Sequence, residues 1–166
     1  MWGEIRKVPI TCVLEYRLRE SKDADERARI AATIEARKAD QRFTVEIKHI
    51  GSDDDPMAWG RLNAEEATVR HKARVRARRA VEADGEPISE AAVSSAMARD
   101  PQWEMDFGKI MRAWIVAGVV GGDVEALRLF RLGDAVGGAG GGSSLWIEAA
   151  TEVKRWQTVT ADEGKG

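Results

Sequence analysis

The strongest helical pattern in the chain lies at residues 100–114, DPQWEMDFGKIMRAW. Asp100 is a typical N-cap residue, and Pro101 suits the first helical position because no backbone N–H donor is needed there. Large apolar residues then recur at spacings of 4, 3, 1 and 3, which places them on one face of a helix. They are Trp103, Phe107, Ile110, Met111 and Trp114. The pattern predicts a core helix, buried against its neighbours.

Further helices are predicted around this stretch, so that residues 57–136 form a helical body. One helix runs from Asn63 to about Ala83. Its residues 69–77 also alternate as in a strand, but the cap, the alanines and the arginines favour a helix. Shorter helices are predicted after a cap at Ser89 and over residues 123–132, following the glycines at positions 121 and 122 that end the core helix.

The end of the chain has a different composition. Residues 137–142 are five glycines and one alanine, which predicts a flexible linker. Residues 143–157 carry apolar residues at helical spacing and predict a C-terminal helix. The polar residues 158–166 predict a disordered tail.

Residues 5–50 show the pattern of a strand, a helix and a second strand. Apolar and polar residues alternate over residues 8–19 and again over residues 43–47, and both alternations predict half-buried strands. Between them, Asp23 begins a capping box, and an alanine-rich and arginine-rich helix follows to Lys38. The sequence therefore predicts an α+β fold, with a small N-terminal β-α-β unit followed by a predominantly helical body. A chain of this length predicts a single domain, which we place at residues 1–157.

Composition excludes several classes of protein. The chain of 166 residues has 26 Lys and Arg against 28 Asp and Glu, so its net charge of -2 gives no overall attraction to nucleic acid or to an anionic membrane. One cysteine and two histidines are too few for a disulfide framework or a structural zinc site, and no cofactor is predicted. No secretory signal or membrane-spanning run is visible, so we expect a cytoplasmic protein.

Six basic residues without an intervening acid follow one another in the predicted helix that ends near residue 83. In a helix they form two rows beside the alanines, and such a surface could follow a phosphate backbone. They are Arg70, Lys72, Arg74, Arg76, Arg78 and Arg79. The alternative is packing: residues 61–80 carry seven basic and two acidic groups, whereas residues 81–106 carry one basic and seven acidic groups. We favour the packing of oppositely charged helices, because no aromatic residue for base stacking interrupts the basic run.

No catalytic residues are predicted, and the chain is interpreted as non-enzymatic. Cys12 is expected on the buried side of its strand, where a thiol is inert. The acidic residues 53–55 suit a solvated turn, because the glycine and the distal glutamate of a calcium loop are missing. Most tryptophans lie in apolar stripes, whereas Trp2 and Trp59 lie outside them and are the candidates for contact with a partner.

The last residues carry a resemblance to a known family. Glu163, Gly164, Lys165 and Gly166 are a permitted translation of a G- and A-rich run, on which a programmed ribosomal slip occurs in tail assembly chaperones of long-tailed bacteriophages. The helical body and polar end also resemble these small proteins. The resemblance implies a non-enzymatic helper in the host cytoplasm that binds a helical protein client, such as the tape-measure protein, during tail assembly. It assigns no binding residue, and the oligomeric state stays open.

Overall fold

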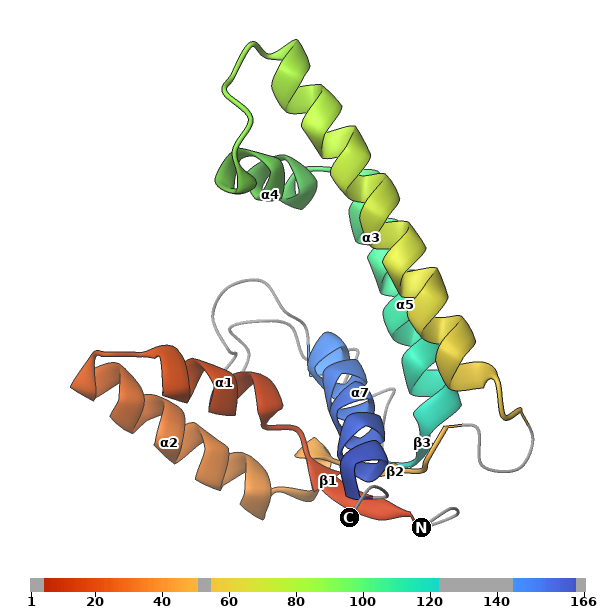
Figure 1. Ribbon diagram of the computed structural model, residues 1–166. Helices are drawn as coiled ribbons and strands as arrows, with labels where there is room; N and C mark the ends of the chain where they lie inside the picture. The colour runs from red at the N-terminus through yellow and green to blue at the C-terminus, as the bar shows by residue number, and fades with distance from the viewer. Residues whose placement is uncertain (1–4, 51–54, 123–144, 164–166) are drawn as a thin grey trace. The chain divides into compact units, whose positions relative to one another are not determined.

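The structure, a computed structural model, describes residues 5–50, 55–122 and 145–163, the last of these from residue 158 onwards by backbone alone. It confirms an α+β fold that is mostly helical and contains a small antiparallel sheet (Figure 1). The helix predicted at residues 123–132 and the linker predicted at residues 137–142 lie outside the described residues.

Two compact units are present where the sequence predicted one domain. The first unit consists of Met1–Pro56 and Trp114–Gly166, and the second consists of Met57–Ala113. Helix α5 (Pro101–Gly118) begins in the second unit and ends in the first. Each unit therefore has a core of its own, and each is described separately below.

The sheet of the first unit has the strand order β1-β2-β3, with antiparallel neighbours. Strand β1 (Arg6–Pro9) is an edge strand, and its Val8 lies opposite Val45 of β2 (Thr44–Ile47). The buried residues of β2 alternate as the sequence predicted. The third strand, β3 (Val119–Gly121), was not predicted.

Helix α5 ends earlier than the two glycines at positions 121 and 122 suggested, and this allows β3 to form. Its last residue is Gly118, whose carbonyl accepts a hydrogen bond from Lys48 N at 2.8 Å. Gly122 has φ of +105°, and a Cβ there would lie 2.9 Å from Thr44 O. A side chain would therefore clash with β2, so glycine is needed at this position for the sheet and not only to end a helix.

The strand predicted over residues 8–19 is wrong beyond Pro9, because the chain forms helix α1 (Cys12–Glu20) there. The alternating pattern contains a helical one, since Leu14 and Leu18 are four residues apart and share a helix face. Leu14 packs with Ile30 and Ile34 of the next helix, with Leu18 against the same cluster. The strand pattern would have buried Tyr16, which is exposed instead. The unit therefore has two α-helices between β1 and β2.

The helix predicted from the Asp23 cap is confirmed as α2 (Ala24–Ala39). The Asp23 carboxylate accepts hydrogen bonds from the backbone N–H groups of Asp25 and Glu26, which satisfies two donors of the first turn. After α2, the short 3₁₀ helix η1 (Gln41–Phe43) leads into β2.

The C-terminal helix is α7 (Leu145–Glu163), which begins where the sequence predicted but continues past residue 157. The expected disorder is therefore wrong for residues 158–163. Its buried face includes Leu145, Ala149 and Val153, all on the predicted stripe. The Val153 side chain lies where a Cβ on Gly118 would be, so the end of α5 and α7 pack closely.

The second unit is built on helix α3 (Ala58–Ala83), which packs against α4 (Glu90–Ala98) and contacts the first part of α5 through Arg70. Helix α3 begins before the predicted Asn63, whereas the caps of α4 and α5 are confirmed: Ser89 Oγ accepts from Ala92 N, and Asp100 Oδ1 accepts from Gln102 N. Among the described residues, no helix combines the length and the apolar character that crossing a bilayer requires.

Candidate functional site

The predicted basic run lies on α3, and four of its six residues form ion pairs within the second unit. Two of these pairs link α3 to the acidic segment that follows it in the sequence. Arg74 Nη2 lies 2.6 Å from Glu90 Oε1, and Arg76 Nη2 lies 2.9 Å from Asp100 Oδ2. These are the contacts that the packing interpretation predicted between oppositely charged segments.

Two further pairs lie within α3 itself. Arg70 Nη2 is 3.2 Å from Glu66 Oε1, and Arg78 Nε is 3.5 Å from Glu82 Oε1, both at helical i,i+4 spacing. Glu66 is buried, so its carboxylate has lost more hydration than that of the exposed Glu82. The ion pair with Arg70 therefore offsets a larger desolvation cost than the pair of Glu82 with Arg78 does. These arginines therefore compensate acids of their own helix.

Arg70 also contacts the aromatic residues of α5. Its guanidinium carbon lies 5.5 Å from the ring centroid of Trp103 and 5.4 Å from that of Phe107. The two rings are neighbours, with centroids 4.9 Å apart. Such cation-π contacts contribute about 0.5–1 kcal/mol each at partly exposed sites. Arg70 is thus used in joining α3 to α5.

The two remaining residues of the basic run are Lys72 and Arg79. Both side chains are exposed, and within the described part of the second unit neither forms an ion pair. Only these two cations of the run are therefore without a carboxylate partner in the described residues and open to a phosphate. The other four pair with carboxylates.

Two shallow hollows lie where α3 meets α4. The first, of about 360 Å³, has apolar residues Val75, Ile88 and Val93 in its lining, beside the basic residues Arg74 and Arg78. The second, of about 330 Å³, is lined by small alanines together with both acidic and basic side chains. The first hollow has more large apolar side chains in its lining than the second, and one of them, Ile88, is exposed.

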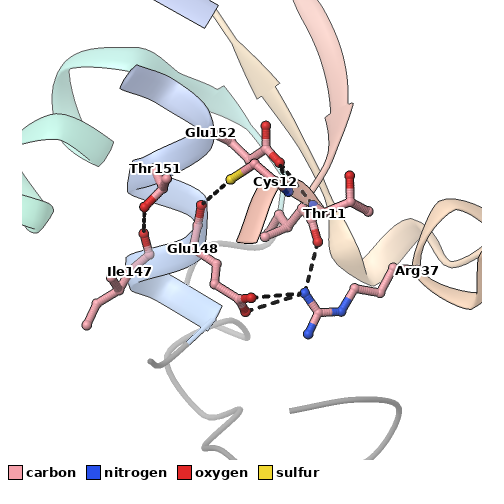
Figure 2. Close-up of polar contacts among 8 residues, drawn as sticks. Thr11, Cys12, Arg37, Ile147, Glu148, Thr151 and Glu152 are labelled. Atoms are coloured by element: carbon pink, nitrogen blue, oxygen red, sulfur yellow. Dashed lines mark hydrogen bonds and ion pairs between the residues drawn. The ribbon is translucent and has the colours of Figure 1, made fainter. Parts of the chain in front are cut away.

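The first unit contains a second candidate site, a fully buried polar cluster formed by Arg37 of α2 and by Glu148 and Glu152 of α7 (Figure 2). Arg37 Nη1 donates to the carbonyl oxygen of Ile10 at 2.9 Å, and it lies 3.4 Å from each carboxylate oxygen of Glu148. This one guanidinium therefore joins α2 to α7 and to the segment after β1.

Glu152 caps the N-terminus of α1. Its Oε1 accepts hydrogen bonds from Thr11 N at 3.0 Å and Cys12 N at 2.6 Å (Figure 2). Thr11 is the N-cap by position, but its side chain makes no capping bond. A carboxylate at a helix N-terminus is favoured by the unpaired N–H donors and by the helix dipole. The cap of α1 thus comes from a residue 140 positions away from Cys12.

Burial raises the pKa of Glu148 above its ordinary value, although the charge of Arg37 opposes this effect. Burial likewise raises the pKa of Glu152, against the hydrogen bonds donated by Thr11 and Cys12. The pKa of the Cys12 thiol is raised by burial and by the nearby Glu152. These effects keep the Cys12 thiol protonated, and Cys12 lies at the start of a helix and not in the strand that the sequence predicted.

The tryptophans divide as follows. Trp114 is buried, Trp103 and Trp156 are half-buried, and Trp59 is exposed, as its position outside the apolar stripes predicted. The guanidinium of Arg6 lies 4.9 Å from the Trp156 ring centroid. Trp2 lies outside the described residues, as do two of the three aspartates predicted to form a turn at positions 53–55. Within the described parts, no three His, Cys, Asp or Glu side chains are grouped as metal ligands would be.

The buried cluster was not found from the sequence. One signal was present: Glu148 and Glu152 are four residues apart and lie among the apolar positions 145, 149 and 153 of the same helix. Acids within an apolar helix face are a sign of buried, paired carboxylates. Their partner Arg37 gave no such signal, because it follows several other arginines in an alanine-rich helix.

Comparisons with protein-family models, with curated proteins and with solved structures gave no match to this chain.

Proposed function

We propose that this chain is a non-enzymatic assembly chaperone of the kind found in long-tailed bacteriophages, which acts in the host cytoplasm on a helical protein client such as a tape-measure protein. The observation that carries the proposal is the surface of the second unit. Four large apolar side chains are exposed there, while most of the basic run is used in ion pairs. Two of them lie at the start of α3, one beyond its end and one in α5, and we call them the exposed apolar group: Met57, Trp59, Ile88 and Met105.

The physical argument concerns what such a group can bind. A long apolar helical client would aggregate unless its apolar face is covered. Side chains such as Trp59 and Met105 can provide that cover, since fully burying one large apolar side chain contributes up to about 1.5–3 kcal/mol. The hollow beside Ile88 adds Val75 and Val93 on the same unit, and the charged side chains around them suit the polar edge of an amphipathic helix.

The test is co-expression with a long apolar helical protein of the proposed client class, a tape-measure protein. We expect the soluble fraction of that client to rise when the full chain is present, because the exposed apolar group covers the client's apolar face. The measurement compares client in the soluble and pelleted fractions with and without this chain. A client whose solubility does not change with the chain present would refute the proposal.

A nucleic-acid-binding accessory protein is the second candidate, and the exposed Lys72 and Arg79 favour it. Our proposal predicts that binding to a generic labelled DNA duplex is weak even at low salt, and that it is unchanged in the variant Lys72→Ala/Arg79→Ala. The control Lys22→Ala/Lys38→Ala removes two exposed charges from the first unit instead. Tight binding that weakens steeply with salt, and weakens further only in the Lys72 and Arg79 variant, would establish the nucleic-acid function instead.

A further inference from the structure

The buried cluster of the first unit contains more negative than positive charge. Arg37 brings one positive charge, whereas Glu148 and Glu152 bring two negative ones, and all three residues are within 1% of complete burial. We propose that the docking of α7 onto α1 and α2 is proton-linked, so that α7 is held more firmly in mildly acidic than in mildly alkaline solution. The cluster would act as a pH-sensitive latch, independent of the proposed function.

The other charged groups around the cluster do not remove the imbalance. From α7, Arg155 Nη1 lies 4.0 Å from Glu152 Oε2, but it is 2.6 Å from Glu15 Oε2 of α1 and is 46% exposed. From α1, the partly exposed Arg17 acts on Glu148 by its charge but pairs with Glu26 at 3.1 Å, and Cys12 is a neutral thiol. Glu152 Oε2 itself is buried and has no hydrogen-bond partner within the described residues. The buried groups therefore carry one uncompensated negative charge when both carboxyls are ionised.

The direction of the pH effect follows from this excess. Burying an unpaired charge is costly, so the native cluster binds a proton more tightly than the unfolded chain does. The raised pKa values of both carboxyls agree with this direction. A group with a raised native pKa contributes stability that is complete below its unfolded value, here 4.5, and is lost as the pH rises through the native pKa.

Helix α7 is the element expected to loosen. It carries both carboxylates, and their partners Arg37, Thr11 and Cys12 lie on other elements. When the second carboxyl loses its proton, a second negative charge is buried between α7 and its neighbours. The free-energy cost of that charge weakens the packing of α7 against them. Because the charge of Glu152 acts directly on Glu148, the two carboxyls are expected to titrate as a unit.

Hydrogen–deuterium exchange of the full chain tests this directly, with rates divided by the intrinsic rate at each pH. We expect the protection of α7 and of the α1 N-terminus to fall between about pH 5 and about pH 8, by about tenfold for each unit by which the native pKa exceeds the unfolded one. In Glu152→Gln the amide oxygen can still accept from Thr11 and Cys12, so we expect the fall to shrink to less than about twofold. The exposed Glu35→Gln is the matched control and should behave as the parent chain.

The comparison with Glu152→Gln separates the cluster from His49, whose pKa is lowered by burial and whose titration acts in the opposite direction. Protection that is equal at both pH values, or higher at the alkaline one, would overturn the proposal, and so would an undiminished fall in Glu152→Gln. If that variant does not fold, carboxyl-detected NMR titration of the parent chain decides the matter. Native pKa values for both carboxyls at or below 4.5 would then contradict the latch.

Discussion

Replacing Arg37 by methionine is expected to lower the free energy of unfolding by about 3–5 kcal/mol at neutral pH, the usual cost of leaving a buried charge without its partner. Methionine fills much of the volume of the arginine stem, so the loss comes from the stranded Glu148 carboxylate and from the Ile10 carbonyl. Denaturant unfolding of the parent and variant chains measures the difference. Lys38→Met is the matched control, since this neighbouring side chain is exposed and its loss should change stability by less than about 0.5 kcal/mol.

The same variant gives two further checks on the charge argument. The difference in free energy of unfolding between Arg37→Met and the parent should be smaller in mildly acidic solution, because protonation of Glu148 removes the unpaired buried charge. Adding Glu148→Leu should restore much of the stability, since replacing a whole buried ion pair by apolar residues is often neutral or stabilising. An Arg37→Met chain as stable as its parent at neutral pH would show that the cluster is not buried as described.

Replacing Trp114 by alanine should cost a similar amount, about 3–5 kcal/mol. Trp114 is 1% exposed and is among the largest fully buried side chains in the described residues. Its removal would leave a cavity where α5 enters the first unit, and the Lys154 ammonium, 5.7 Å from the ring centroid, would lose its cation-π contact. Thermal and denaturant unfolding measure the loss.

Trp59→Ala is the control for this substitution, because Trp59 is 44% exposed at the start of α3 and its removal should cost less than about 1 kcal/mol. Equal losses of stability at both positions would contradict the burial of Trp114 in α5. A Trp114→Ala chain that unfolds as the parent does would contradict it more strongly.

Elements with complete local signals could be predicted from the sequence. The caps at Asp23, Ser89 and Asp100 each precede the helix they were expected to start, because capping is decided by residues two or three positions apart. The alternation that ends at Ile47 gave β2 for the same reason, since its pattern lies within the strand itself.

Elements decided by distant contacts could not be predicted. Residues 12–20 alternate as a strand would, but they form α1, whose first N–H groups are satisfied by Glu152. Strand β3 has three residues and exists because β2 lies beside it. Gly122, the residue after β3, lies close to Thr44 O of β2. In both cases the deciding partner is far away in the sequence, so local periodicity gave the wrong element or none.

The basic run shows how far composition alone can lead. The opposite net charges of residues 61–80 and 81–106 predicted cross-helix ion pairs, and the pairs Arg74–Glu90 and Arg76–Asp100 are present. Which arginines would pair, and that Lys72 and Arg79 would stay exposed, depended on side-chain positions that only the structure gives. The remaining question is whether the second unit binds a protein or a nucleic acid.

One crossed binding measurement tests that central claim most directly. The full chain, an apolar variant (Met57→Ser, Trp59→Ser, Met105→Ser) and the basic variant Lys72→Ala/Arg79→Ala are each titrated with a long helical tape-measure protein and with a labelled DNA duplex. We predict that the apolar variant binds the protein at least about tenfold more weakly, a loss of about 1.4 kcal/mol, while the basic variant binds it as the parent does. Tight duplex binding lost only in the basic variant, with no affinity for the helical protein, would contradict the account.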